Sequence, residues 1–169
     1  SGPVLRDVLK TSEGLDKVPK SDQKGRVFVV GGPLAPDTAA RAGQKLQREP
    51  HLLLASAETG LFSWGTMADF SAHDGCVGRP AGAADVQAVD ALGRVRPVGH
   101  DGLIRVTTPW MASSFVDNTR TAQPEDRSGE DDGWWNSGLL GSIAADGRIT
   151  ISGVLGAVGQ PAPERPRPL

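Results

Sequence analysis

The chain has 169 residues and a mass of 17.6 kDa, the size of one ordinary domain. Its 18 Lys and Arg against 20 Asp and Glu give a net charge of −2 without a basic stripe, which argues against a nucleic-acid partner. Its 22 glycines and 13 prolines, about a fifth of the chain, exclude a bundle of long helices. No apolar run approaches the roughly 20 residues that span a bilayer, and the lone Cys76 cannot form an internal disulfide, so we predict a cytoplasmic protein without a membrane span.

The N-terminal segment combines apolar and charged residues. Val4, Leu5, Val8 and Leu9 lie at helical spacing before Gly14, which predicts a short helix followed by a loop. We divide the chain into four parts on such changes of composition. They are a leader at 1–24, an α/β segment at 25–74, a mainly β segment at 75–153 and a proline-rich tail at 154–169.

The α/β segment has the pattern of a βαβ-like unit. The run of β-branched and aromatic residues at 26–30 predicts a strand, which a Gly-Gly-Pro turn at 31–33 ends. Pro36 fits the first turn of a helix that extends to about Gln47. The short apolar run at 51–54, after Pro50, is typical of a buried parallel strand.

The segment 75–153 has a different period. Short strands are predicted at 86–89, 103–107 and 148–151, separated by glycine-rich turns. Ile149 and Ile151 alternate with polar residues, as in a half-buried antiparallel strand. The fold class is therefore α/β followed by mainly β, with a small barrel or curled sheet. We interpret the acidic stretch 118–132 as a solvated loop rather than a metal site, and the tail as extended.

Two loops could carry chemistry. The turn of Gly31, Gly32 and Pro33 follows a strand and precedes a helix, where backbone N–H groups can approach an anion or nucleotide. The plain alternative is a strand-to-helix turn, because the spacing matches neither a dinucleotide site nor a phosphate loop. The second loop follows the strand 51–54 and offers a carboxylate beside a hydroxyl. It consists of Ser56, Ala57, Glu58, Thr59 and Gly60, and its plain alternative is a polar loop that caps a strand.

Other reactive side chains give weaker signals. Cys76 with nearby His73 could form a thiol and base pair, but a packing role is the simpler interpretation. The three histidines lack the spacing of a zinc site. Trp134 and Trp135 are expected to pack on the β segment, whereas Trp64, beyond the second loop, is our candidate for an acyl pocket.

Five collinear pieces of sequence resemble one known family. The family is the adenylate-forming superfamily of acyl-CoA synthetases, firefly luciferase and nonribosomal adenylation domains, and the resemblance covers about residues 26 to 158. The pieces are VGGPLAP at 30–36, SAETG at 56–60, VGRPAGAADVQAVDALGRVRPVGHDGLIRV at 77–106, TPWMASSFVDN at 108–118 and GWWNSGLLGSIAADGRITISG at 133–153.

The resemblance implies a degenerate nucleotide site. It implies that the Gly31-Gly32 turn and the 56–60 loop frame adenine, that Glu58 binds Mg²⁺, and that 77–151 forms a small distorted antiparallel β-barrel. The family's adenine-stacking aromatic falls at Leu54, and its phosphate-binding Thr falls at Ala57. The Asp that binds both ribose hydroxyls falls at Leu139, which cannot accept a hydrogen bond. A cation that contacts the nucleotide falls at Val154.

The leading functional hypothesis is a truncated, degenerate relative of these ligases, a pseudoenzyme without autonomous adenylation. The family's phosphate loop and the catalytic lysine of its C-terminal domain fall outside this sequence, so we assign no catalytic residue and require no cofactor, although the resemblance implies ATP or AMP and Mg²⁺. The chain would bind an acyl or carboxylate ligand, or a protein partner, or self-associate. Two alternatives stay open: one part of a split or larger ligase that activates a carboxylic acid with ATP, and a purely structural or interaction module.

Overall fold

The structure is a computed structural model that describes residues 26–112 and 133–155. The predictions of a leader helix at 1–24 and an acidic loop at 118–132 lie outside these residues, as does the tail from residue 156. Within the described part of the chain, no helix is long and apolar enough to cross a membrane.

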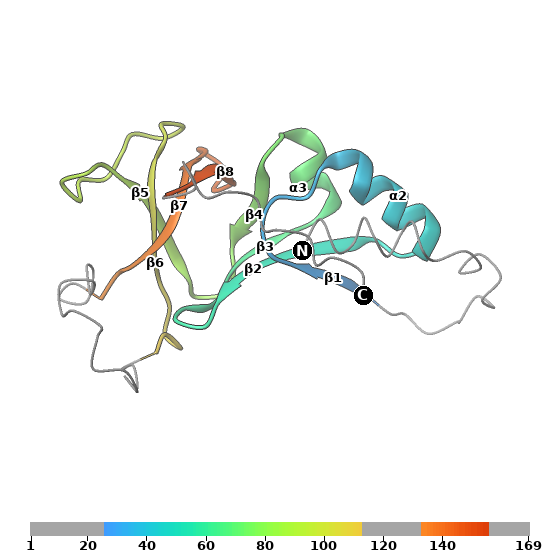
Figure 1. Ribbon diagram of the computed structural model, residues 1–169, viewed down its shortest axis with the longest axis horizontal. Coiled ribbons are helices and arrows are strands. Elements are labelled where there is room, and N and C mark those ends of the chain that lie inside the picture. Colours follow the sequence, from blue (N-terminus) through green and yellow to red (C-terminus); the bar gives the residue numbers. More distant parts are fainter. Residues whose placement is uncertain (1–25, 113–132, 156–169) are drawn as a thin grey trace, which may run out of the picture.

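One mixed sheet of eight strands organises the described residues, in the order β1-β2-β3-β4-β8-β7-β6-β5 (Figure 1). Two helices accompany it. The elements are β1 (Val27–Val30), α2 (Pro36–Leu46), β2 (Pro50–Ser56), β3 (Gly60–Gly65), α3 (Met67–Ala72), β4 (Cys76–Pro80), β5 (Asp85–Val89), β6 (Gly102–Thr107), β7 (Trp135–Ile143) and β8 (Ile149–Val154).

The predicted βαβ-like unit is confirmed. Strands β1 and β2 are parallel, with Val27 opposite Pro50 and Val30 opposite Leu53. Pro36 begins α2, and Gln47 ends the helix in the left-handed conformation at φ 50°. Helices α2 and α3 lie on one side of the β1–β3 part of the sheet (Figure 1).

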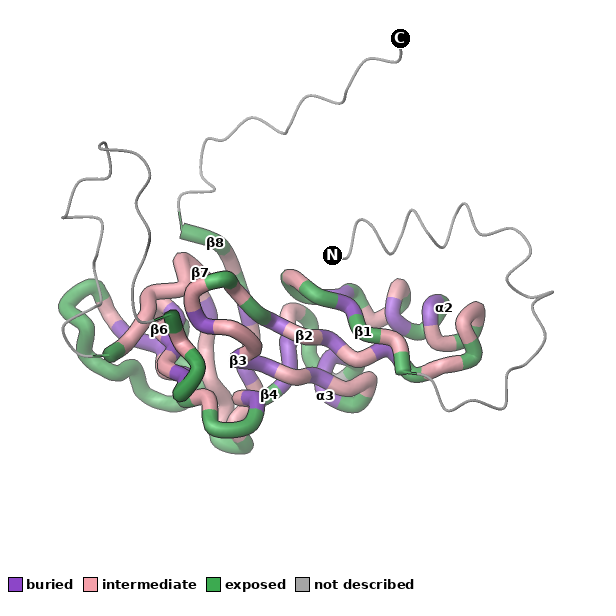
Figure 2. Tube along the Cα trace, turned by 90° about the horizontal axis from the view of Figure 1, so that it is seen from below, coloured by how far each residue is buried: buried purple, intermediate pink, exposed green. Residues whose placement is uncertain are grey.

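Part of the core lies between these helices and the sheet, and the same buried cluster continues into β5, β6 and β8. Leu52 in β2 is fully buried, as are Ala39 in α2 and Phe70 in α3, and Figure 2 shows the buried stretches running along the strands. Because side chains alternate along a strand, Val29 faces this core while Phe28 and Val30 on either side of it are exposed.

Strand β4 connects the two halves of the sheet. It pairs with β3 on one side and with β8 on the other, both antiparallel. Gly78 in β4 has φ +104°, and a Cβ atom there would overlap the backbone carbonyl of Trp64. Only glycine therefore allows β3 and β4 to approach this closely.

Strands β5 to β8 form the predicted antiparallel part. The prediction for Ile149 and Ile151 is confirmed, since both are buried in β8. The expected barrel is not closed: among the described residues, β4 and β5 lie at opposite ends of the antiparallel run and do not pair. The sheet instead ends at β5, whose outer side meets the Arg94–Arg96 stretch through a bridge between Val89 and Val95. The fold class stands as α/β followed by mainly β, in an open sheet.

Candidate functional site

The two predicted loops lie at the same end of the sheet, where strands β1 and β2 finish. Strands β1 and β2 are parallel neighbours, so the Gly31-Gly32-Pro33 turn and the loop after Ser56 both follow carboxyl ends of adjacent strands. The N–H of Gly31 donates to the Leu53 carbonyl at 3.0 Å and fixes the turn against β2. Gly31 has φ 128°, and no atom lies within 4 Å of where a Gly32 Cβ would be. This turn therefore leaves open space at Gly32.

The second loop is a tight β-hairpin turn between β2 and β3. The Thr59 N–H donates to Ser56 Oγ at 3.1 Å, and the two side-chain hydroxyls lie 2.9 Å apart. Thr59 is fully buried, whereas Ala57 is exposed and Glu58 half-buried. The Thr59 hydroxyl is thus used inside the turn, and the Glu58 carboxylate is the polar group that the turn offers to a ligand.

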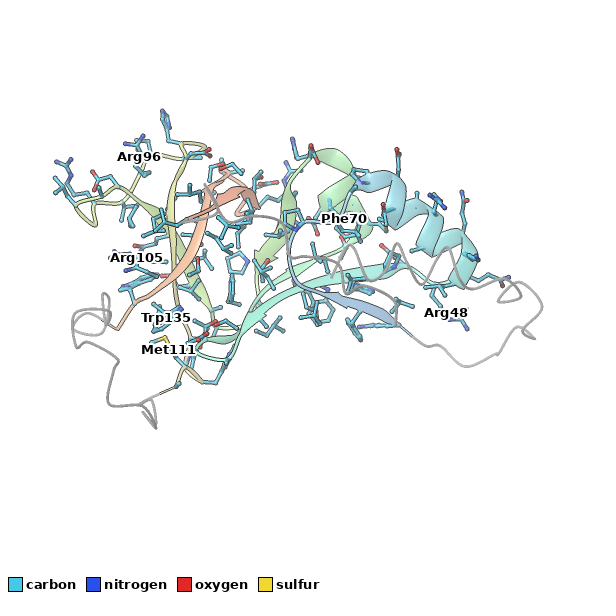
Figure 3. The ribbon with its side chains drawn as sticks, in the orientation of Figure 1. Arg48, Phe70, Arg96, Arg105, Met111 and Trp135 are labelled. Carbon is cyan, nitrogen blue, oxygen red and sulfur yellow. The ribbon has the colours of Figure 1, made fainter. Side chains whose placement is uncertain are left out.

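A third segment that the sequence did not assign to the site holds this turn. Thr108 Oγ1 donates to the Thr59 carbonyl at 2.8 Å, and the Ala112 N–H donates to the Glu58 carbonyl at 2.8 Å. Figure 3 shows the neighbouring Met111 beside the β2–β3 turn. The segment that follows β6 therefore fixes the backbone carbonyls of Glu58 and Thr59.

Trp110 in that segment lies across two glycines. A Cβ on Gly60, whose φ is +64°, would come 2.6 Å from Trp110 Cδ1, and a Cβ on Gly82 would come 3.4 Å from the far end of the same ring. The ring remains 49% exposed. This aromatic side chain borders the turn. The sequence placed Trp110 in one of the pieces that resemble the family, but its contact with Gly60 is tertiary and could not be predicted from the sequence.

The adenine-stacking position belongs to the core. Leu54 is buried and packs in the core cluster with Leu52 and Phe62. A side chain buried in the core cannot stack on a purine base.

Leu139 and Val154, the two other positions that depart from the family pattern, form one apolar patch. Leu139 in β7 pairs directly with Val154 in β8, so the expected ribose-binding carboxylate and the expected cation are replaced by cross-strand neighbours. Leu139 packs against the core cluster, while Val154 is 52% exposed and Leu155 is exposed beside it. The Leu155 N–H donates to the Gly138 carbonyl at 2.6 Å, which fixes β8 at this point. Where the resemblance implies hydrogen-bonding groups, this chain presents an apolar surface.

Trp64 lies on the side of the sheet opposite α2 and α3. Its Nε1 donates to His51 Nδ1 at 3.1 Å, and its ring meets Phe28 edge-on with centroids 6.1 Å apart. It stands opposite Leu53, three positions before the end of β2. The acyl-pocket role of Trp64 stays a prediction. By contrast, the Arg105 guanidinium lies over the Trp134 ring, 4.6 Å from its centroid. This cation–π contact is compatible with the packing role predicted for Trp134.

The alternative of a reactive thiol loses its physical basis. Cys76 is buried, and this burial raises the pKa of its thiol above the usual range. His73 is exposed, and the hydrogen bond between the two residues joins the Cys76 N–H to the His73 carbonyl. Cys76 is a packing residue beside the ion pair of Asp69 and Arg79.

Glu58 is a partial fit for Mg²⁺. The ion favours octahedral oxygen coordination and is commonly held by one or two carboxylates, waters and substrate phosphates. Among residues 26–112 and 133–155, no group of three or more His, Cys, Asp or Glu side chains is arranged to hold a metal. One carboxylate therefore suffices only together with a bound triphosphate, and the family resemblance implies that the ribose of such a nucleotide lies at the positions of Leu139 and Val154, which are paired across β7 and β8.

The fold of this chain matches part of the fold of solved adenylate-forming enzymes. Searches found no matching family model and no matching curated protein. Solved structures do match. The amide bond synthetase McbA from Marinactinospora thermotolerans superposes with a TM-score of 0.74 at 21% identity, over 91% of this chain and 30% of that one.

Two further enzymes show the same relation. MatB from Rhodopseudomonas palustris has a TM-score of 0.69 at 22% identity, over 90% of this chain and 29% of its own. The O-succinylbenzoate coenzyme A synthetase MenE from Bacillus subtilis, solved with ATP and magnesium, has 0.67 at 18%, over 88% of this chain and 29% of its own. The chain thus spans about 30% of these enzymes, and the likeness establishes a shared fold.

Proposed function

We propose that this chain is an adenylate-forming ligase relative that does not adenylate a substrate on its own and binds an acyl group or a protein partner instead. The observation that carries the proposal is the apolar pair of Leu139 and Val154. A buried or half-buried ribose needs a hydrogen-bond acceptor there, and charge-assisted hydrogen bonds contribute about 1.5–3 kcal/mol each. The loss of two charged groups at neighbouring positions weakens nucleotide binding by orders of magnitude.

The same pair supports the binding role. Val154 and Leu155 are exposed large apolar side chains beside half-buried Leu139, and exposed apolar surface of this kind marks ligand or partner sites. The Glu58 turn lies in the same sheet and retains its shape through Thr108 and Ala112. An apolar acyl chain requires burial of surface rather than hydrogen bonds, so the replaced positions suit it better than they suit a nucleotide.

Calorimetric titration with AMP and MgCl₂ tests this proposal. We expect wild-type protein to give no measurable heat of binding up to about 1 mM AMP, and Leu139→Asp to gain affinity through a restored acceptor, by about tenfold or more. Leu140→Asp is the matched control, because neighbouring side chains in β7 point to opposite faces of the sheet. Circular dichroism establishes that each variant is folded. Micromolar binding of AMP by the wild type would contradict the proposal.

A second candidate function retains the ATP-dependent activation of a carboxylic acid. The chain could form one part of a larger or split ligase that activates a carboxylic acid with ATP, in which another part supplies the phosphate loop and the lysine. Two observations favour it. The Gly31-Gly32 turn and Glu58 both follow the carboxyl ends of adjacent parallel strands, and the chain spans about 30% of the length of its structural neighbours. Recovery of ATP–pyrophosphate exchange when the protein is added to fractions of its own cell extract would select this candidate.

A further inference from the structure

Three ring side chains from neighbouring strands meet on the sheet face opposite α2 and α3. They are Phe28 in β1, His51 in β2 and Trp64 in β3, with ring centroids between 5.6 and 6.1 Å apart. Phe28 lies directly opposite His51 in the parallel β1–β2 pair, so both point away from the helices that cover Val29. Trp64 meets both of the other rings edge-on, at interplanar angles of 82° and 90°. The strand order β1-β2-β3 thus brings the three rings together.

One hydrogen bond in this cluster requires a neutral histidine. The Trp64 Nε1–H donates to His51 Nδ1 at 3.1 Å. An indole N–H can only donate, so His51 Nδ1 must offer a lone pair, and the proton of the neutral ring is then on Nε2. A protonated imidazole carries N–H groups on both ring nitrogens and has no acceptor left for this bond. The contact between His51 and Trp64 is therefore specific to one charge state of His51.

The surroundings of His51 are poor in charge. Strands β1, β2 and β3 contain no Asp, Glu, Lys or Arg, and the charged side chains of α2 and α3 belong to the other side of the sheet. The nearest charged residues along these strands are Arg26, just before β1, and Glu49, just before β2. Glu49 Oε1 accepts the Met67 N–H at 3.3 Å. Since imidazole ordinarily changes charge between about pH 5 and 8, His51 is the group of this face that titrates in that range.

We propose that His51 and Trp64 form a pH-sensitive switch, in which protonation of His51 breaks their hydrogen bond and releases the Trp64 indole. Once Nδ1 is protonated, two N–H groups face each other without an acceptor between them. Both side chains are half-buried, so each N–H can bond to water after the rings turn apart. The neutral state keeps the three rings packed, and the protonated state separates Trp64 from His51.

The switch acts on the residue that the sequence singles out for an acyl pocket. While His51 is neutral, the face around Trp64 is apolar and its indole is fixed. Protonation releases the indole and places a cation among the aromatic side chains, and a charge in an apolar surface opposes the burial that an apolar ligand requires. The switch itself does not depend on whether an acyl group binds there, so it stands or falls separately from the proposed function.

NMR spectra of the nitrogen-labelled full chain test the switch. The Trp64 indole N–H signal is identified by its absence in Trp64→Phe. We expect this proton signal to move upfield as the pH falls from about 8 to 5, along the same curve as the ring protons of His51, because the N–H loses its hydrogen bond. The indole signals of the other three tryptophans and the circular dichroism establish that the protein stays folded.

Two histidine variants separate the switch from a general effect of pH. In His51→Gln the side-chain carbonyl can accept the same hydrogen bond and does not titrate, so the Trp64 signal should stay in place down to about pH 5. His100→Gln is the matched control, because His100 is exposed in the β5–β6 connection with its ring nitrogen beside the Val98 carbonyl. It should leave the Trp64 response unchanged.

Three results overturn the proposal. The first is a Trp64 signal that does not move while His51 titrates. The second is a His51 ring that stays neutral throughout this pH range. The third is a movement of the Trp64 signal that persists in folded His51→Gln.

Discussion

Replacement of Gly78 by alanine is expected to lower the free energy of unfolding by more than about 3 kcal/mol. Two costs combine at this position. The backbone of Gly78 has φ +104°, which an L side chain rarely adopts, and the added Cβ would overlap the Trp64 carbonyl of the neighbouring strand. Backbone cannot move aside as a flexible side chain can, so β3 and β4 must separate.

The position of Gly78 makes this separation costly for the whole chain. Strand β4 is the one that joins the β1–β3 part of the sheet to β8, so a disturbed β3–β4 contact divides the sheet in two. Against a total stability that is typically about 5–15 kcal/mol, the variant should be partly unfolded at about 37 °C.

Gly32→Ala provides the matched control for the same chemical change. No atom lies within 4 Å of the place that an added Cβ would take, and the φ of Gly32 is outside the positive range that strains other residues. Urea unfolding followed by tryptophan fluorescence should place Gly32→Ala within about 0.5 kcal/mol of wild type or slightly above it. Equal midpoints for the two variants would show that β3 and β4 do not approach as described.

Replacement of Asp69 by asparagine is expected to cost about 2 kcal/mol at pH 7 and much less at pH 3. Asp69 is buried at the start of α3, where its Oδ2 accepts the Thr66 N–H at 2.9 Å and the Thr66 hydroxyl at 2.8 Å. Its Oδ1 accepts the guanidinium of Arg79 in β4. The Asp69 carboxylate thus caps α3 and links it to β4, the strand that joins the two halves of the sheet.

The pH dependence follows from the direction of the pKa shift. Burial alone would raise the pKa of Asp69, but the Thr66 hydrogen bonds and the charge of Arg79 outweigh it and hold that pKa below its ordinary value of 3.8. The stabilisation is therefore complete above about pH 4 and is lost as the pH falls through the folded-state pKa. Urea titrations at pH 7, 5 and 3 measure it. Asp37→Asn, an exposed change in α2, is the control, and a wild-type advantage that does not shrink toward pH 3 would contradict the assignment.

The sequence was most informative where prolines and local periods mark the elements. Pro36 begins α2 and Pro50 begins β2, and the apolar run at 51–54 predicted the parallel strand that pairs with β1. Strands β3, β4 and β7 were missed. The glycines within them, among them Gly65, Gly78 and Gly141, indicate breaks in a sequence but close strand contacts in the fold. The barrel expectation failed for a related reason, since closure depends on whether β4 meets β5, which no local pattern encodes.

For the candidate site, too, the sequence predicted some features and the structure alone shows others. The family resemblance singled out Glu58 and Leu139, but only strand register shows that Leu139 and Val154 are opposed and form a single apolar patch. The support of Glu58 by Thr108 and Ala112 joins positions about fifty residues apart. Leu54 appeared in the sequence as a lost stacking surface, and the structure makes it a core residue.

ATP–pyrophosphate exchange by the purified full chain, measured with a panel of short, long and aromatic carboxylic acids, tests most directly whether the chain adenylates on its own. We expect no exchange above the buffer blank with any acid, because the positions where the family resemblance implies a ribose-binding carboxylate and a cation hold the apolar pair Leu139 and Val154. A full-length adenylate-forming synthetase assayed in parallel establishes that the measurement detects the reaction. Robust exchange by this chain alone with any acid of the panel would contradict the proposed loss of autonomous adenylation.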